Sequence, residues 1–270
     1  VYRLKCYEVP EGSRQSKGMN IANLLPIAAD EKVTYMIRVP EFDEEKYLVM
    51  VTKQGIIKRI SLNAYNTARK GGLIALELNE GDELAWVRLT DGNQQVIVAT
   101  KNGLAIRFEE TDVRPMGRQA RGVKAISLRE GDCVVGMCVV TNDDLILTAS
   151  ETGFGRISNV SDYRLQSRGG KGITNYHTEK YGNVAAVSAV KLDEDIIIIS
   201  QEGVIIRIAA DTVRICNRPS KGVTLMRIGE NDKVVTVARA PHEDSESEKT
   251  EETAEEETSE ENTVPETNAE

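Results

Sequence analysis

Residues 49–62 read VMVTKQGIIKRISL, and variants of this stretch recur three more times along the chain. The later copies are VIVATKNGLAIRFE at 96–109, LILTASETGFGRISN at 145–159 and IIIISQEGVIIRIA at 196–209. Each copy has an apolar run rich in β-branched residues, a polar turn with a glycine, and a second run that carries a base. This pattern is typical of a β-hairpin whose turn glycine adopts a positive φ. The turn glycines Gly55, Gly103, Gly153 and Gly203 are separated by 48, 50 and 50 residues.

A second element recurs with the same period, and it is a polar loop that ends in a base followed by glycine. The copies are RQSKG at 14–18, ARKGG at 68–72, RQARG at 118–122, QSRGGKG at 166–172 and NRPSKG at 217–222. An alternating strand follows each loop, and acidic turns at 80–82, 130–132 and 230–232 precede a further strand. Each repeat of about 50 residues therefore supplies about four short strands, and radial repetition of such units protects sheet edges. The sequence predicts an all-β fold, a propeller-like array or β-pinwheel of four-stranded blades.

The repeat boundaries predict a partial array over residues 1–241. Whole blades are expected at 46–93, 94–143, 144–193 and 194–241. The opening residues 1–9 (VYRLKCYEV) match only the second strand of a hairpin, and the first residue is not Met. We therefore expect an N-terminally truncated fragment with about half a blade before the four whole ones.

The charge of the chain is divided between two regions. The whole chain has 34 Lys and Arg against 43 Asp and Glu, but residues 242–270 hold 13 of the acids and one base. The remaining body carries a net charge of +3. The tail has too few apolar residues to offset its ordering entropy, so we expect a disordered acidic tail. We also expect the tail to compete with DNA phosphates for the basic body and so to lower the affinity of the body for nucleic acid. The alternative is a tail that only increases solubility.

Bases recur at fixed positions of the repeats, which in a closed or spiral array places them on one rim. We predict that these bases bind DNA. On the hairpins they are Lys58, Arg59, Arg107, Arg156 and Arg207, with Arg3 and Lys5 at comparable places; in the loops they are Arg14, Lys17, Arg69, Lys70, Arg118, Arg121, Arg168, Lys171, Arg218 and Lys221. The alternative is that they are ordinary solvated bases that discourage edge-to-edge aggregation. Periodic base-glycine loops favour binding of a phosphate backbone that bends around the rim. Because aromatic residues, on which single-stranded bases would stack, make up only 4% of the chain, duplex DNA is favoured over single strands.

Other kinds of site receive little support. The cysteines Cys6, Cys133, Cys138 and Cys216 are scattered and there are two histidines, so neither a zinc site nor a disulfide framework is predicted. No apolar run approaches the length of a membrane helix, and no signal peptide opens the chain. The glycine-rich loop at 166–172 lacks the spacing of a phosphate-binding P-loop. We predict no catalytic residue, metal or cofactor in this chain.

The loops identify a family resemblance. The box-like loop Gln166, Ser167, Arg168, Gly169, Gly170, Lys171 and Gly172 resembles the signature Gln-Arg-Arg-Gly-Gly-Lys-Gly of the C-terminal domain of the bacterial DNA gyrase A subunit, with Ser167 in place of the first Arg. Similarity continues through residues 1–18, 23–26 (NLLP), 81–84 (GDEL) and 113–117 (VRPMG) and in the acidic terminus. In that family the box lies in the first blade, whereas this copy lies in a later one.

The resemblance implies a six-bladed β-pinwheel in the parent protein, which wraps duplex DNA and supports ATP-dependent negative supercoiling. Its expected partners are double-stranded DNA, the gyrase B subunit, and the rest of the gyrase A subunit, in a bacterial cytoplasm. ATP and Mg²⁺ would be used elsewhere in the holoenzyme. The DNA-cleaving tyrosine of the family lies in a region outside this chain, and none of Tyr2, Tyr65, Tyr163 or Tyr176 matches its motif, so the fragment alone should not cleave DNA.

Three alternatives stay open on the sequence alone. The first is the C-terminal domain of the topoisomerase IV A subunit, which is a paralogue with a related array. The second is a β-propeller that serves as a protein-interaction scaffold, which would present apolar or aromatic hot spots on its rim. The third is a free-standing homologue of the wrapping domain.

Overall fold

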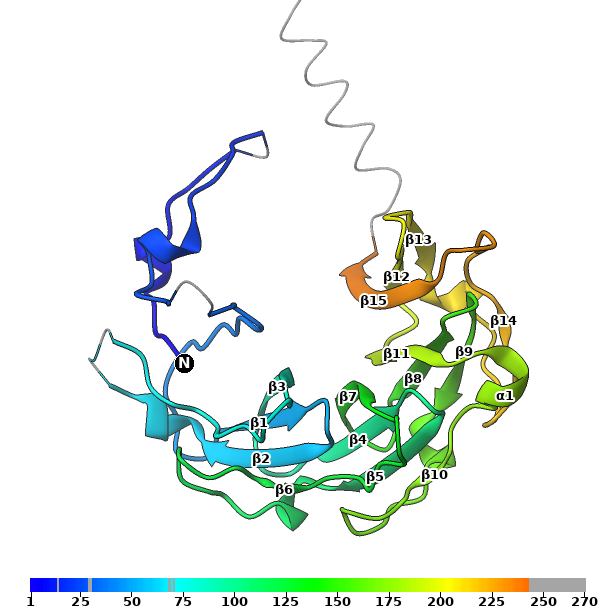
Figure 1. Cartoon of the computed structure of the whole chain (residues 1–270), viewed down its shortest axis with the longest axis horizontal. Helices are drawn as coiled ribbons and strands as arrows, with labels where there is room; N and C mark the ends of the chain where they lie inside the picture. Colours follow the sequence, from blue (N-terminus) through cyan, green and yellow to red (C-terminus); the bar gives the residue numbers. More distant parts are fainter. Residues whose placement is uncertain (14, 29–30, 68, 70, 243–270) are drawn as a thin grey trace, which may run out of the picture.

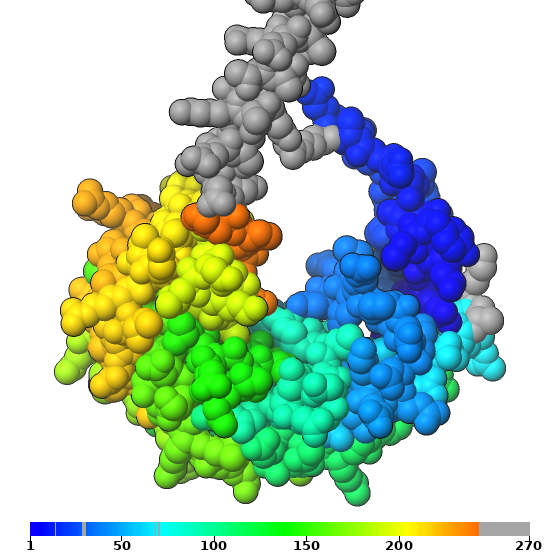
Figure 2. All heavy atoms as spheres, turned by 180° about the vertical axis from the view of Figure 1, so that it is seen from behind, coloured from blue at the N-terminus to red at the C-terminus, as the bar shows by residue number. Residues whose placement is uncertain are grey.

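The computed structural model describes residues 1–13, 15–28, 31–67, 69 and 71–242. The predicted acidic tail beyond His242, together with Arg14 and Lys70, lies outside the described residues. Four antiparallel sheets follow one another in chain order around an open arc (Figures 1 and 2). The N-terminal segment and the last sheet stand at opposite ends of that arc. The predicted all-β, propeller-like array of blades is therefore confirmed.

Each blade is built on one of the hairpins that the repeated stretch predicted. The first sheet has the order β3 (Leu84–Thr90), β1 (Tyr47–Thr52), β2 (Ile56–Ser61) and β6 (Val123–Lys124). The second has the order β7 (Val134–Val140), β4 (Gln95–Thr100), β5 (Leu104–Glu109) and β10 (Ile173–Thr174). The third has the order β11 (Val184–Val190), β8 (Leu145–Ser150), β9 (Phe154–Asn159) and β14 (Val223–Thr224), and the last has β15 (Val234–Pro241), β12 (Glu194–Ser200) and β13 (Ile205–Ala209).

Short helical turns connect the strands. The 3₁₀ helices are η1 (Cys6–Glu8), η2 (Ile21–Asn23), η3 (Leu62–Tyr65), η4 (Glu110–Asp112), η5 (Val160–Asp162) and η6 (Ala210–Thr212). A four-residue α-helix, α1 (Thr178–Tyr181), stands in the third repeat where the others have an acidic turn. In those other repeats the turn aspartate caps the hairpin; in the second repeat, Asp132 accepts hydrogen bonds from the backbone N–H groups of Asn102 and Cys133, both at 2.9 Å.

The short outer strand of each complete sheet comes from the following repeat. Sequence reasoning assigned four strands to each repeat, and it did not show that β6 would pair with β2, β10 with β5 and β14 with β9. A glycine precedes each of these strands because the backbones approach closely. At Gly222, where φ is +81°, a Cβ would lie 1.9 Å from the carbonyl oxygen of Gly155. Every blade except the last is thus completed by its neighbour.

The N-terminal segment repeats this exchange, while the last blade lacks it. The amino group of Val1 donates to the carbonyl oxygen of Leu73 at 2.7 Å, and the N–H of Leu73 donates to the carbonyl oxygen of Val1 at 2.9 Å. At the other end, no fourth strand covers β13 among the described residues, and Ile205 is 62% exposed.

The hydrophobic core lies between consecutive blades. Val49 and Ile57 of the first blade pack in one cluster with Val96 and Ile106 of the second, and two further clusters join the later blades in the same way. On the concave side of the arc the inner strands β3, β7, β11 and β15 succeed one another (Figure 1). The hairpin strands of the first three blades are therefore covered on both faces, which leaves their outer loops at the surface.

Candidate nucleic-acid interface

Four of the predicted DNA-binding bases are buried inside the array. Lys58 and Arg156 have no exposed surface, and Arg59 and Arg107 are 7% and 5% exposed. Their assignment to an exposed rim is wrong, because the second hairpin strand is covered by the next repeat on one face and by its own loop on the other. A buried cation needs hydrogen-bond acceptors, and in each case backbone carbonyl oxygens supply them.

Lys58 shows how such a base is accommodated. Its Nζ donates to the carbonyl oxygens of Ala75 and Arg118, both at 2.6 Å, and to that of Ala120 at 3.0 Å. Burial lowers the pKa of Lys58 below its ordinary value. The ammonium group ties the loop at 118–122, which belongs to the second repeat, to the first blade.

Two arginines on the hairpins make equivalent links between repeats, whereas Arg156 donates within its own repeat. Arg107 donates to the carbonyl oxygens of Val160 at 2.9 Å and Tyr163 at 3.0 Å, and Arg59 donates to that of Glu110 at 3.1 Å. These acceptors lie on or directly after the 3₁₀ helix of the following repeat. Arg156 donates to the carbonyl oxygen of Asn175 at 2.6 Å, and desolvation lowers the pKa of its guanidinium.

The predicted bases at the two ends of the array also have structural contacts. Arg207 on β13 is ion-paired with Asp195 at 2.6 Å. Arg3 donates to Asn66 and Thr67 and its guanidinium lies 4.6 Å from the ring centroid of Phe42. Lys5 and Lys17 are exposed in the N-terminal segment.

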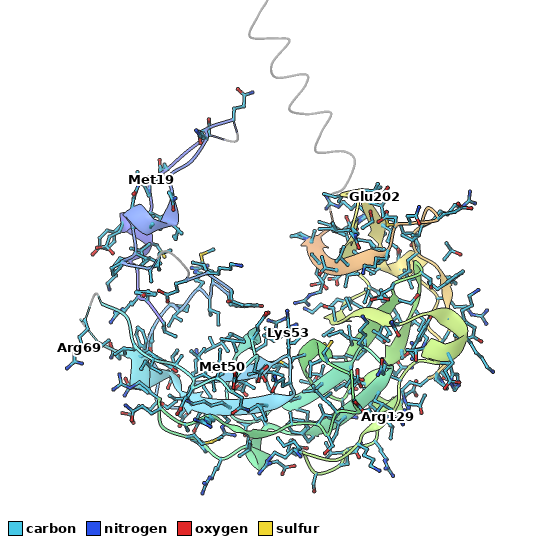
Figure 3. All side chains as sticks on the ribbon, viewed as in Figure 1. Met19, Met50, Lys53, Arg69, Arg129 and Glu202 are labelled. Carbon is cyan, nitrogen blue, oxygen red and sulfur yellow. The ribbon has the colours of Figure 1, made fainter. Side chains whose placement is uncertain are left out.

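The loops at 118–122, 166–172 and 217–222, in contrast, lie at the outer side of the arc, directly before the short strands β6, β10 and β14 (Figure 1). Besides Lys17, the loop bases that are exposed are Arg69, Arg118, Arg121, Lys171 and Lys221. Figure 3 shows Arg69 on the outer side of the first blade, with Lys53 on the opposite, concave side. Arg121 is ion-paired with Glu77 at 2.7 Å on the surface, and the Nζ of Lys221 lies 3.6 Å from the ring centroid of Phe154.

Three further arginines belong to this surface, and sequence reasoning missed them. Arg114, Arg164 and Arg214 are exposed, and each follows a 3₁₀ helix, η4, η5 or η6. Parallel backbone bridges Arg59–Pro115, Arg107–Leu165 and Ile157–Ile215 hold the residue after each arginine against the preceding hairpin. The available signal was their spacing of 50 residues, the same as that of the loop glycines. Lys124 on β6 is a fourth exposed base that was missed.

The box-like loop is attached to the preceding repeat by its arginine. The Nε of Arg168 donates to the carbonyl oxygen of Asp112 at 3.0 Å, and its Nη1 donates to that of Lys124 at 3.2 Å. The N–H of Gly169 donates to the carbonyl oxygen of Ala125 at 2.6 Å. Gln166 and Ser167 lie at the start of the loop, and the Lys171 side chain is exposed beyond it. Gly172 opens strand β10, where a Cβ would lie 2.4 Å from the carbonyl oxygen of Ala105.

We define the outer rim as the exposed bases of residues 111–124, 161–174 and 211–224. Each of these segments holds one acid and three or four bases. Backbone contacts with the neighbouring blade fix all three in the same way, so the positive charge repeats at regular intervals around the array. Among the described residues, no group of three His, Cys, Asp or Glu side chains could hold a metal ion. Such a surface attracts a polyanion.

Comparison with known proteins agrees with this architecture. The family model described as DNA gyrase C-terminal domain, beta-propeller, matches residues 1–40, 46–91, 94–140, 144–191 and 194–241. The chain belongs to the DNA gyrase C-terminal domain family.

Curated relatives of this family member are DNA gyrase A subunits. It is 52% identical over 124 residues to the DNA gyrase A subunit of Clostridium acetobutylicum and 56% identical over 124 residues to that of Halalkalibacterium halodurans. Each alignment covers 46% of this chain and 15% of the relative, so the chain matches only a small part of the relatives' length.

Solved structures of two related domains share its fold. The C-terminal domain of DNA topoisomerase IV gives a TM-score of 0.81 at 27% identity, over 93% of this chain and 79% of that one. A DNA gyrase A C-terminal domain gives a TM-score of 0.73 at 28% identity, over 84% of this chain and 76% of that one. In the described part of this family member, no helix is long and apolar enough to cross a membrane.

Proposed function

We propose that this domain binds duplex DNA along its outer rim and bends it around the array. The observation that carries the proposal is the regular placement of Arg114, Arg164 and Arg214, one exposed arginine in each of three consecutive repeats. Each is accompanied by an exposed base of its own base-glycine loop, Arg121, Lys171 or Lys221. Equivalent positions in a radial array follow a curve, and a bent phosphate backbone matches a curved row of cations.

The free-energy cost of bending the duplex requires many phosphate contacts, and these contacts need not depend on base sequence. Bending a short duplex site by 40–90° costs on the order of 1–6 kcal/mol, which phosphate contacts must offset. Each neutralised phosphate releases condensed counterions, so binding by such a surface weakens steeply with salt. Arginines and backbone N–H groups beside glycines are suitable phosphate ligands because no bulky side chain blocks the approach.

In its biological setting we propose that the domain acts as part of the DNA gyrase A subunit. There it would wrap the segment next to the cleavage site and so support ATP-dependent negative supercoiling by the holoenzyme, which also contains the gyrase B subunit. ATP and Mg²⁺ would act in those other parts, in the bacterial cytoplasm. The gyrase family model and the identity of 52% and 56% over 124 aligned residues of two gyrase A subunits support this assignment.

A second candidate is the C-terminal domain of the topoisomerase IV A subunit. The TM-score of 0.81 to such a domain, over 93% of this chain, favours it on grounds of fold. The sequence relatives favour gyrase. A topological assay reports directly whether this chain wraps DNA with a defined hand.

The test is a ligation assay with the 270-residue chain. Nicked plasmid is incubated with the chain, sealed with ligase, and read as linking-number change at several salt concentrations. We expect a protein-dependent shift that fades with salt. The triple variant Arg114→Ala, Arg164→Ala and Arg214→Ala should lose most of it, and its plot of log affinity against log salt should be shallower by about 0.9 for each phosphate contact removed.

The control removes the same charge from elsewhere on the surface. Lys53, Lys191 and Lys233 are exposed and lie outside the outer rim, so their triple alanine variant should keep the shift. Equal losses in the two triple variants would contradict a rim-specific site. A folded wild-type chain without salt-sensitive DNA binding would favour the scaffold alternative.

A further inference from the structure

We infer that Arg168 and Arg218 are positioning residues that hold the cations of adjacent repeats at a fixed separation. This inference rests on the proposed function, because the cations in question are those that would contact phosphate. The exposed arginines of these segments present charge to phosphate, whereas Arg168 and Arg218 determine where that charge lies.

The two arginines make the same pair of contacts in successive repeats. The Nε of Arg168 donates to the carbonyl oxygen of Asp112 at 3.0 Å, and the Nε of Arg218 donates to that of Asp162 at 2.9 Å. The Nη1 atoms donate to the carbonyl oxygens of Lys124 and Thr174, respectively. In both repeats the acceptors precede the arginine by 56 and 44 residues. Both side chains are half-buried, whereas Arg114 and Arg164 are exposed.

The carbonyls that receive these bonds belong to segments that carry rim cations. Asp112 precedes Arg114 by two residues, and Lys124 is itself an exposed base. Lys171 follows Arg168 by three residues in the same loop. The Arg168 guanidinium therefore links Arg114 and Lys124 of one repeat to Lys171 of the next. Arg218 links Arg164 to Lys221 in the same way.

Arginine is required for this role because its planar fork presents Nε and Nη1 together in a fixed geometry. A lysine at the same position keeps the charge but offers one flexible ammonium group. Substitution of arginine by lysine thus separates the electrostatic contribution of the residue from its geometric one.

The preceding repeat supplies a natural comparison. Arg118 occupies the position equivalent to Arg168 and Arg218, yet in the described part of the chain it is exposed and makes no such pair of bonds. Its loop is held from the inside instead, because the Nζ of Lys58 donates to the backbone carbonyls of Arg118 and Ala120. Arg118→Lys therefore measures what the change from arginine to lysine costs at a rim base without these bonds, which makes it the matched control.

The experiment compares Arg168→Lys/Arg218→Lys with Arg118→Lys in the 270-residue chain. DNA affinity and its salt dependence are measured together with linking-number change. For the double variant we expect affinity within about twofold of wild type, an unchanged salt slope, and a linking-number shift reduced by at least half per bound chain. The loss of linking-number shift in the double variant should be more than twice that in Arg118→Lys. A full linking-number shift in the double variant would overturn the inference, and so would a loss of affinity with a shallower salt slope, which would mark direct phosphate contacts.

Hydrogen exchange without DNA tests the links made by Arg168 separately from DNA binding. The N–H groups of Gly169 and Ser127 donate across the same interface, to the carbonyl oxygens of Ala125 and Gly170. Hydrogen exchange at these two amides should accelerate at least several-fold in Arg168→Lys, while the amides of the β4–β5 hairpin stay protected. Unchanged exchange at both amides would overturn the positioning role. Absence of any linking-number shift in the wild-type chain would instead overturn the proposed function.

Discussion

The bases on the hairpin strands and those on the outer loops have the same chemistry but opposite environments. Lys58 and Arg156 are fully buried and donate to backbone carbonyl oxygens inside the array. Lys171 and Lys221 recur with equal regularity and are exposed. In a blade covered on both faces, a base on a strand therefore becomes an internal link, whereas a base on a loop remains available to a ligand. Periodic charge by itself therefore does not identify a binding surface.

Removal of a strand base should have the largest effect on stability. Arg156→Ala leaves a cavity and an unpaired carbonyl oxygen on Asn175, so we expect the free energy of unfolding to fall by about 4 kcal/mol. Urea denaturation of the 270-residue chain measures this change. Lys171→Ala on the exposed loop should alter stability by no more than about 0.5 kcal/mol. Similar losses in the two variants would contradict the distinction between strand and loop bases.

Two glycines, one packed against a neighbouring strand and one facing open space, allow the same comparison for the backbone. Gly222 and Gly203 both have positive φ, 81° and 85°, but a Cβ at Gly222 would lie 1.9 Å from the carbonyl oxygen of Gly155, and one at Gly203 would meet no atom within 4 Å. Gly203→Ala should cost about 1–2 kcal/mol, which is the cost of the left-handed conformation alone. Gly222→Ala should cost at least about 3 kcal/mol, because relief of the clash requires β14 to move away from β9.

Thermal denaturation of the two glycine variants gives the comparison. Equal shifts in Tm would show that the short strand β14 is not held closely against β9. A larger shift for Gly222→Ala would support the exchange of strands between repeats as a source of stability.

The repeats made the hairpins predictable from the sequence, while the exchange of strands between them was not. Gly55, Gly103, Gly153 and Gly203 mark turns that the structure places between paired strands. The two-residue strand β6 is too short to give a period, and its pairing with β2 depends on a contact between repeats. The burial of Lys58 was hidden for the same reason, since an alternating strand pattern does not reveal that both faces are covered.

The candidate surface was predictable in part. The loop bases stood out because a glycine follows several of them, and the structure places Lys171 and Lys221 on the outer side. Arg114, Arg164 and Arg214 had an equally regular spacing but lacked a neighbouring glycine, and only the structure shows them exposed. The role of Arg168 as a link to the carbonyl of Asp112 depends on tertiary geometry that no local pattern carries.

The smallest expected effect concerns a buried and an exposed tyrosine, and it appears only at high pH. Burial raises the pKa of Tyr65 to about 12, whereas Tyr7 is 84% exposed. The folded chain then holds the Tyr65 proton at a pH where the unfolded chain, with a tyrosine pKa near 10, has released it. Stability is therefore lost as pH rises above about 10, by about 1.4 kcal/mol at pH 11.

Tyr65→Phe removes this loss, so the variant should gain that amount relative to wild type between pH 8 and pH 11. Urea denaturation at the two pH values measures the gain, and Tyr7→Phe should show none. A parallel pH dependence in wild type and Tyr65→Phe would mean that the Tyr65 hydroxyl, which lies 3.5 Å from the carbonyl oxygen of Ala75 in the interior, titrates like that of an exposed tyrosine.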